Sequence, residues 1–108
     1  MNSCVFMGRL TADCEKLETD NTTIVKFRFV VDRPYKVNGE SLADFFNCVI
    51  FGKLAETFYG LDIGKGTKLL LSGSMQNNYF TDKNGILRYE DQFVVTSFEF
   101  CEPRKAVK

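Results

Sequence analysis

Phenylalanine and other apolar residues recur at every second position in several runs of this chain, and a period of two is typical of a β-strand. The clearest run spans 22–32, where the positions between the apolar residues include Lys26 and Arg28. A strand with this pattern has one apolar face and one largely cationic face, so it predicts a sheet that covers a core on one side only. The apolar positions of this run are Val25, Phe27, Phe29 and Val31.

Four further runs have strand character, at 4–10, 42–52, 67–81 and 86–102. Gly8 and Gly73 lie inside two of them and predict a bulge or bend. The sequence DKNG at 82–85 predicts a hairpin turn, and Pro34 with the Asn38-Gly39 pair predicts a hairpin or flexible loop at 33–40.

A short helix is predicted between the third and fourth runs, because Leu54, Phe58 and Leu61 follow the spacing i, i+4, i+7 within 52–62. Three strands, one helix and two strands form the order of an OB-fold. That fold class is all-β, a five-stranded Greek-key barrel with one short helix between strands 3 and 4. A sandwich or another small barrel also fits the order of elements. A chain of 108 residues without internal repeats is expected to be one domain.

The third run is apolar on both faces. Phe45 and Phe51 lie on one face and Phe46, Cys48 and Ile50 on the other. Such a strand is either buried on both sides or has one face covered by a partner or ligand, so the pattern leaves the exposure of Phe45 and Phe51 open. For most other rings in strands and in the helix a place in the core or an interface is the expectation. These are Phe6, Phe27, Phe29, Phe58, Phe93, Phe98 and Phe100.

Catalytic and metal chemistry find little support in the sequence. It contains no histidine and no phosphate-binding or nucleophile motif, so we predict no catalytic residues and no enzyme. Its four cysteines form no C-x-x-C pair, so we predict no metal site, no cofactor and free thiols. No apolar run approaches a membrane span, and the N-terminus lacks a signal peptide, so a cytoplasmic protein without membrane contact is expected.

The sequence feature that indicates a function is the placement of aromatic residues beside basic ones. Flat rings stack on any base and lysine or arginine neutralises phosphates, so this combination predicts sequence-tolerant binding of single-stranded nucleic acid. Net charge is zero, but residues 13–20 carry a net charge of −3, so the remainder carries +3 and a binding face can be basic. The residues with this pattern are Tyr35, Phe45, Phe51, Tyr79 and Phe80, with Arg9, Arg33, Lys36, Lys53, Lys83 and Arg88.

The sequence resembles the bacterial-type single-stranded DNA-binding protein (SSB) family over residues 1 to about 103. The similarity is carried by VFMGRLTADCE, KFRFVVDRPY, DFFNCVIFGKLAE, IGKGTKLLLSGSMQNNYFTDKNG and RYEDQFVVTSFEFCEP. The resemblance implies an OB-fold domain at 1–103 that coats and protects single-stranded DNA in replication, recombination or repair, with 104–108 as a loose end. It also implies a homo-oligomer, expected to be a tetramer with a dimer as the alternative.

The family's stacking positions fall on Tyr35, Phe45, Phe51 and Phe80, which matches the pattern found above. Its basic positions match Arg9, Lys53 and Lys65, whereas Arg33, Lys36 and Arg88 are added because they lie near the same loops. Phe46 falls where the family has a subunit interface.

Two departures from the family affect affinity and partners. The chain has no Trp, which stacks over a larger area than Phe or Tyr. It also ends at EPRKAVK without the acidic tip that recruits replication and recombination proteins, as in a truncated chain or a tail-less phage or plasmid member. An alternative function is an OB-fold interaction module of the replisome or primosome with weak DNA affinity, because a fold alone does not define a function.

Overall fold

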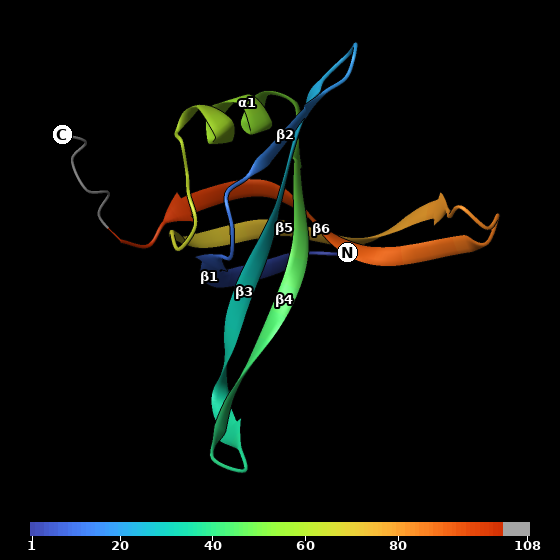
Figure 1. The fold of residues 1–108 in the computed structure, drawn as a ribbon. Helices are drawn as coiled ribbons and strands as arrows, with labels where there is room; N and C mark the ends of the chain where they lie inside the picture. The colour runs from blue at the N-terminus through green and yellow to red at the C-terminus, as the bar shows by residue number, and fades with distance from the viewer. Residues whose placement is uncertain (103–108) are drawn as a thin grey trace.

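Five of the six strands close into a barrel that one helix covers at its end, as the computed structural model shows for residues 1–102 (Figure 1). The elements are β1 Cys4–Leu10, β2 Glu15–Glu18, β3 Thr23–Val37, β4 Glu40–Phe51, α1 Gly52–Gly60, β5 Lys68–Thr81 and β6 Leu87–Phe100. The predicted loose end at 104–108 lies outside the described residues.

The strand pairing defines the fold. β1 pairs antiparallel with β5 along most of its length and with β3 at its end, β3 pairs with β4, and β5 pairs with β6. A short parallel contact between β4 and β6 closes the ring. The helix follows the third barrel strand, so the predicted OB-fold is confirmed.

Aromatic rings fill the barrel. Phe29, Phe58 and Phe93 are fully buried. Phe58 comes from α1 and stacks on Phe27 with 5.0 Å between ring centroids, so the helix is held by the ring that it contributes to the core. The core expectation for Phe27, Phe29, Phe58 and Phe93 is confirmed. The other three rings expected there, Phe6, Phe98 and Phe100, are partly buried against this core, as is Phe46.

Two long hairpins extend from the barrel in different directions (Figure 1). In the first, β3 runs five residues further than predicted, through Pro34 to Val37, and reaches a two-residue turn. Asn38 and Gly39 have φ values of 53° and 80°, which the predicted Asn-Gly turn requires. The flexible-loop alternative for 33–40 is therefore wrong. A register shift between Asp32 and Lys36 accommodates the proline, which has no N–H to donate to β4.

The acidic segment at 13–20, where the sequence predicted no strand, contains one. β2 pairs with β3, with Glu15 opposite Lys26 and Leu17 opposite Ile24. All four residues of β2 are exposed, so no apolar period marks the strand in the sequence. The helix ends at Gly60, two residues earlier than predicted.

The two glycines inside strands permit close backbone approach. At Gly73 the β5–β6 register shifts, which confirms a bulge. The β1–β5 register instead runs unbroken through Gly8, so of the bulge or bend expected there the bulge is absent. Gly8 lies where β3 crosses β1, and a Cβ at this position would be 2.0 Å from the carbonyl oxygen of Val30. Among residues 1–102, no helix is long and apolar enough to cross a membrane.

The cysteines give a labelling prediction. All four are free, and burial raises the pKa of Cys48 to about 12 and contributes most to raising that of Cys14 to about 11. Because the thiolate is the reactive form, iodoacetamide at pH 8 is expected to label Cys4 and Cys101 well before Cys14 and Cys48. Mass spectrometry of timed samples measures the order, and early labelling of Cys48 in the folded protein would contradict its burial.

Candidate nucleic-acid interface

Phe45 and Phe51 lie on the outer face of β4. Their side chains are 52% and 45% exposed, whereas Cys48 and Ile50, which alternate with this face, are buried in the core. The sequence left open whether Phe45 and Phe51 are buried, and the structure shows that both are exposed. The two rings are six residues apart on one strand, which corresponds to about 20 Å.

β3 places basic residues between these two rings. Its residue Val30 is opposite Phe45, Arg28 is opposite Asn47, and Lys26 is opposite Val49. Directly paired residues share a face of the sheet, so Lys26 and Arg28 lie on the same face as Phe45 and Phe51. The cationic face predicted for 22–32 therefore continues the aromatic face of β4.

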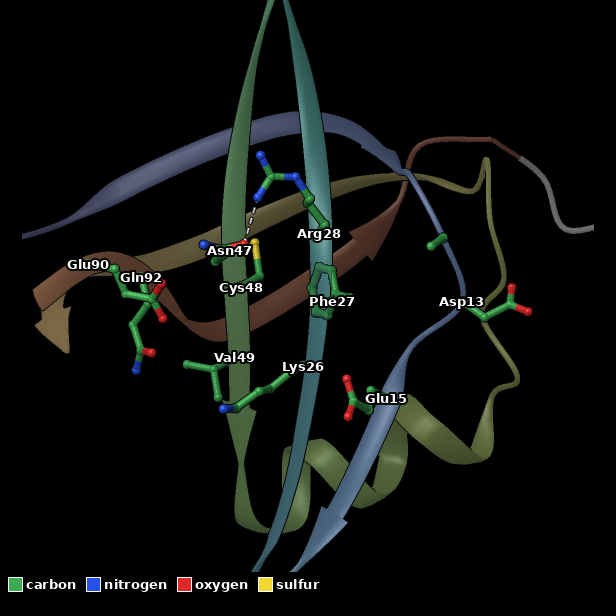
Figure 2. Close-up of a pocket in the computed structure, with 11 residues that line it drawn as sticks. Asp13, Glu15, Lys26, Phe27, Arg28, Asn47, Cys48, Val49, Glu90 and Gln92 are labelled. Atoms are coloured by element: carbon green, nitrogen blue, oxygen red, sulfur yellow. Dashed lines mark hydrogen bonds between the residues drawn. The ribbon is translucent and has the colours of Figure 1, made fainter. Parts of the chain in front are cut away.

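Arg28 is held in place by two neighbours on β4. Its guanidinium donates a hydrogen bond of 2.8 Å to Oδ1 of Asn47 (Figure 2). It also lies over the Phe45 ring, 5.2 Å from the centroid. An arginine fixed against an aromatic ring loses less side-chain entropy when it binds a phosphate than a free one would.

A groove of about 390 Å³ follows this face. Lys26, Arg28 and Asn47 line its centre (Figure 2). Glu15 borders it on the β2 side and Glu90 on the β6 side, so carboxylates flank the cations.

Beyond the groove, toward the helix, the same face of the sheet is apolar. The register of β2, β3 and β4 puts Leu17, Ile24 and Phe51 in one row across three strands. Leu17 and Phe51 are both exposed. Lys53, one residue inside α1, is exposed close to Phe51 in the chain.

The β5–β6 hairpin has two different faces. Phe80 is opposite Arg88 in the ladder, and Asn78 is opposite Glu90, which borders the groove, so Phe80 lies on the groove side. Tyr79 is opposite Tyr89 on the other face, with 5.8 Å between their ring centroids. The structure therefore separates Tyr79 from the other aromatic candidates.

Arg9 and Arg88 each hold a carboxylate. Arg9 donates to both carboxylate oxygens of Glu102 at 3.2 Å, and Arg88 donates to Asp82 in the hairpin turn. The hydrogen bonds from Arg9 are the largest cause that lowers the pKa of Glu102, and the hydrogen bond from Arg88 is the largest cause that lowers the pKa of Asp82. A phosphate therefore competes with a carboxylate for either arginine.

The loop candidates near Pro34 lie in the bulge of β3. Tyr35 is 54% exposed, and its hydroxyl accepts a hydrogen bond from Arg33, which also pairs with Asp44. The lysines that the sequence suggested are all exposed, and within residues 1–102 no ion pair involves Lys36, Lys53 or Lys65.

Two groove residues, Lys26 and Arg28, and their neighbour on the same face, Leu17, were absent from the sequence-based candidates. Lys26 and Arg28 were visible as the cationic face of their strand, but the sequence did not show that this face adjoins Phe45. Leu17 had no signal, because it lies in the polar segment around β2.

The chain matches the Single-strand binding protein family over residues 1–101. It is 36% identical over 104 residues to the single-stranded DNA-binding protein of Clostridium perfringens, covering 94% of this chain and 67% of that protein. It is 38% identical over 109 residues to that of Fusobacterium nucleatum, covering 96% and 69%. With its OB-fold barrel and exposed aromatic and basic residues, the chain belongs to the single-strand binding protein family and binds single-stranded DNA.

Proposed function

We propose that single-stranded DNA lies along the outer face of β3 and β4, with one base stacked on Phe45 and another on Phe51. The observation that carries this proposal is the row of exposed rings and cations on one face, in register across two strands. Base stacking contributes about 1–3 kcal/mol per base and tolerates any sequence. The protein would coat single strands in replication, recombination or repair without catalysing a reaction.

Lys26 and Arg28 meet the phosphates between the two stacked bases, and Lys53 meets those beyond Phe51. These three residues have no carboxylate partner among the ion pairs of residues 1–102. The flanking carboxylates Glu15 and Glu90 repel phosphates at the groove edges and so direct the backbone to its centre.

Phe80 and Tyr35 extend the path onto the two hairpins. The position of Phe80 on the groove side of the β5–β6 hairpin supports a role in stacking. Tyr35 is exposed near the end of the β3–β4 hairpin beside Lys36. Its hydroxyl accepts a hydrogen bond from Arg33, whose partner Asp44 lies on the face of β4 opposite to that of Phe45. A DNA strand that follows Phe45 must therefore cross the edge of this hairpin to reach Tyr35. Further phosphate contacts at the margins of this path are Arg9, Lys65 and Arg88. Arg9 and Arg88 exchange a carboxylate for a phosphate when they bind it. Tyr79 joins the interface only if DNA also contacts the opposite face of the hairpin.

Members of the family assemble as oligomers, and we propose a tetramer for this chain. Val5 and Met7 are exposed apolar residues on one face of β1, and Leu70 is paired with Met7 on β5. A row of apolar residues on a sheet face suits an interface between subunits. Phe46 is half-buried and stacks on Phe6 at 4.4 Å, so part of its ring is available to a partner. Sedimentation equilibrium distinguishes a tetramer from a dimer.

The interface predicts the salt dependence of binding. Each phosphate contact on a single strand contributes about −0.7 to the slope of log K against log salt. Lys26→Gln and Arg28→Gln are each expected to make the slope less negative by about that amount. Fluorescence anisotropy of a labelled oligo-dT over a range of NaCl concentrations measures both slopes, with a matched duplex as a control.

Glu56→Gln is a matched substitution of an exposed residue on α1 outside the groove, and it should leave the slope unchanged. Unchanged slopes for both Lys26→Gln and Arg28→Gln would contradict the proposed path. Equal affinity for duplex and single strand would contradict stacking as its basis.

A further inference from the structure

The bulge in β3 carries two candidates whose roles the structure separates. Between Asp32 and Lys36, β3 has two more residues than the stretch of β4 opposite it, from Ala43 to Ser41. Arg33 and Tyr35 lie in this bulge. Backbone pairing constrains a bulge less than a regular ladder, so side-chain contacts must orient a ring at this position.

Arg33 makes contacts with all three of its guanidinium nitrogens. Nε and Nη2 donate to the two carboxylate oxygens of Asp44 at 2.9 and 2.7 Å. Nη1 donates to the hydroxyl of Tyr35 at 3.3 Å. A planar fork can hold two acceptors in a fixed relation, which a lysine ammonium on its flexible stem does not.

Asp44 anchors this cluster to the regular part of β4, where it is paired with Val31. It precedes Phe45, so it points to the opposite face of the strand. Its hydrogen bonds with Arg33 lower its pKa, so the charged contact persists to a lower pH than for an unpaired aspartate. Arg33 therefore connects a fixed point on β4 to the free end of the Tyr35 side chain.

We propose that Arg33 is a positioning residue for Tyr35 and not a phosphate contact. It fixes the exposed ring so that a base can stack on it without first ordering the side chain. This inference rests on the proposed function of Tyr35 as a stacking residue. Each guanidinium nitrogen already donates one hydrogen bond, and Asp44 neutralises the charge of Arg33, so a phosphate would have to compete with this carboxylate.

Arg33→Lys is the main test because it keeps the charge and removes the fork. A positioning role predicts that Arg33→Lys and Arg33→Gln weaken oligo-dT binding equally, by about twofold to tenfold, with the salt slope of the wild type. A phosphate contact predicts that Arg33→Lys binds like the wild type and that Arg33→Gln makes the slope less negative by about 0.7. The second pattern would overturn the inference.

Asp44→Ala distinguishes the two roles by the sign of its effect. With a positioning role, loss of the anchor weakens binding about as much as Arg33→Gln does. With a phosphate contact, removal of the neighbouring negative charge frees Arg33 and strengthens binding. Stronger binding by Asp44→Ala would therefore contradict the inference. The cluster is on the surface of the hairpin, and circular dichroism verifies that each variant is folded.

Tyr35→Ala separates failure of this inference from failure of the proposed function. If Arg33 acts through Tyr35, Arg33→Gln has no additional effect in the Tyr35→Ala background. If Tyr35→Ala weakens binding and Arg33→Gln adds its full effect to it, only the positioning role is wrong. If Tyr35→Ala binds like the wild type, Tyr35 does not stack on a base. Its proposed stacking role and the positioning role of Arg33 then both fail, whereas the proposal for Phe45 and Phe51 is unaffected.

Discussion

Replacing Phe45 and Phe51 together by alanine is expected to weaken single-stranded DNA binding by about 2–6 kcal/mol. The lower bound corresponds to roughly a 30-fold loss of affinity. The physical reason is that both rings are exposed on one face of β4, so each offers a surface on which a base can stack. Anisotropy titration with labelled oligo-dT at fixed NaCl concentration measures the loss.

The control for this prediction is on the other face of the β5–β6 hairpin. Tyr79 and Tyr89 are 65% and 67% exposed and also form an aromatic pair, but they face away from the groove side. Replacing both by alanine is expected to change the affinity less than twofold, which is less than the loss expected from removing one stacked base. A loss comparable to that of the Phe45 and Phe51 variant would show that both faces of the hairpin bind DNA.

Gly73→Ala is expected to destabilise the protein by about 3 kcal/mol or more, because added atoms in a packed interior force the backbone to move. The new Cβ would lie 1.9 Å from the carbonyl oxygen of Val94, which belongs to the neighbouring strand and cannot rotate away. For a chain of about 100 residues this corresponds to a fall of about 12 °C or more in Tm. Thermal denaturation followed by circular dichroism measures it.

Gly60→Ala is the matched control, because nothing lies within 4 Å of a Cβ at that position and its φ is not positive. It should leave stability unchanged or raise it by about 0.4–1 kcal/mol through the lower entropy of the unfolded chain. Equal melting temperatures for Gly73→Ala and Gly60→Ala would show that the β5–β6 bulge can open without cost.

The period of two in the sequence was sufficient to predict the strands of the barrel, although the order of elements also fitted a sandwich. Alternation located every barrel strand and placed Phe27, Phe29 and Phe93 in the core, because burial selects apolar residues at alternate positions. It could not reveal β2, whose four residues are all exposed and pair with β3 through the backbone. It also ended β3 too early, because Pro34 is compatible with a strand only where a bulge removes the need for its N–H.

The candidate interface was predictable in its rings and in Lys53, but not in the basic residues between the rings. Phe45 and Phe51 stood out as rings on one face of an apolar strand, but their exposure depends on which face the barrel buries. The basic part depends on register between strands, which a single sequence does not give. The pairing of β3 with β4 places Arg28 over the ring of Phe45, whereas Arg33 forms an ion pair with Asp44 that neutralises its charge.

The unequal strand pairing described above has a consequence for how fast the barrel assembles. The two long hairpins join neighbouring parts of the chain and can form within about 1–10 μs. Three further pairings complete the ring. β1 pairs with β5 from Cys4 to Arg9. Two short contacts then close it: Cys48 and Val49 pair with Phe93 and Val94, and Arg9 and Leu10 pair with Val30 and Phe29. These contacts join residues distant in the chain and must overcome the entropy of closing long loops before they gain any burial. The hairpins that carry the exposed rings can thus form early, whereas the groove between them takes shape only at the slow closure of the barrel.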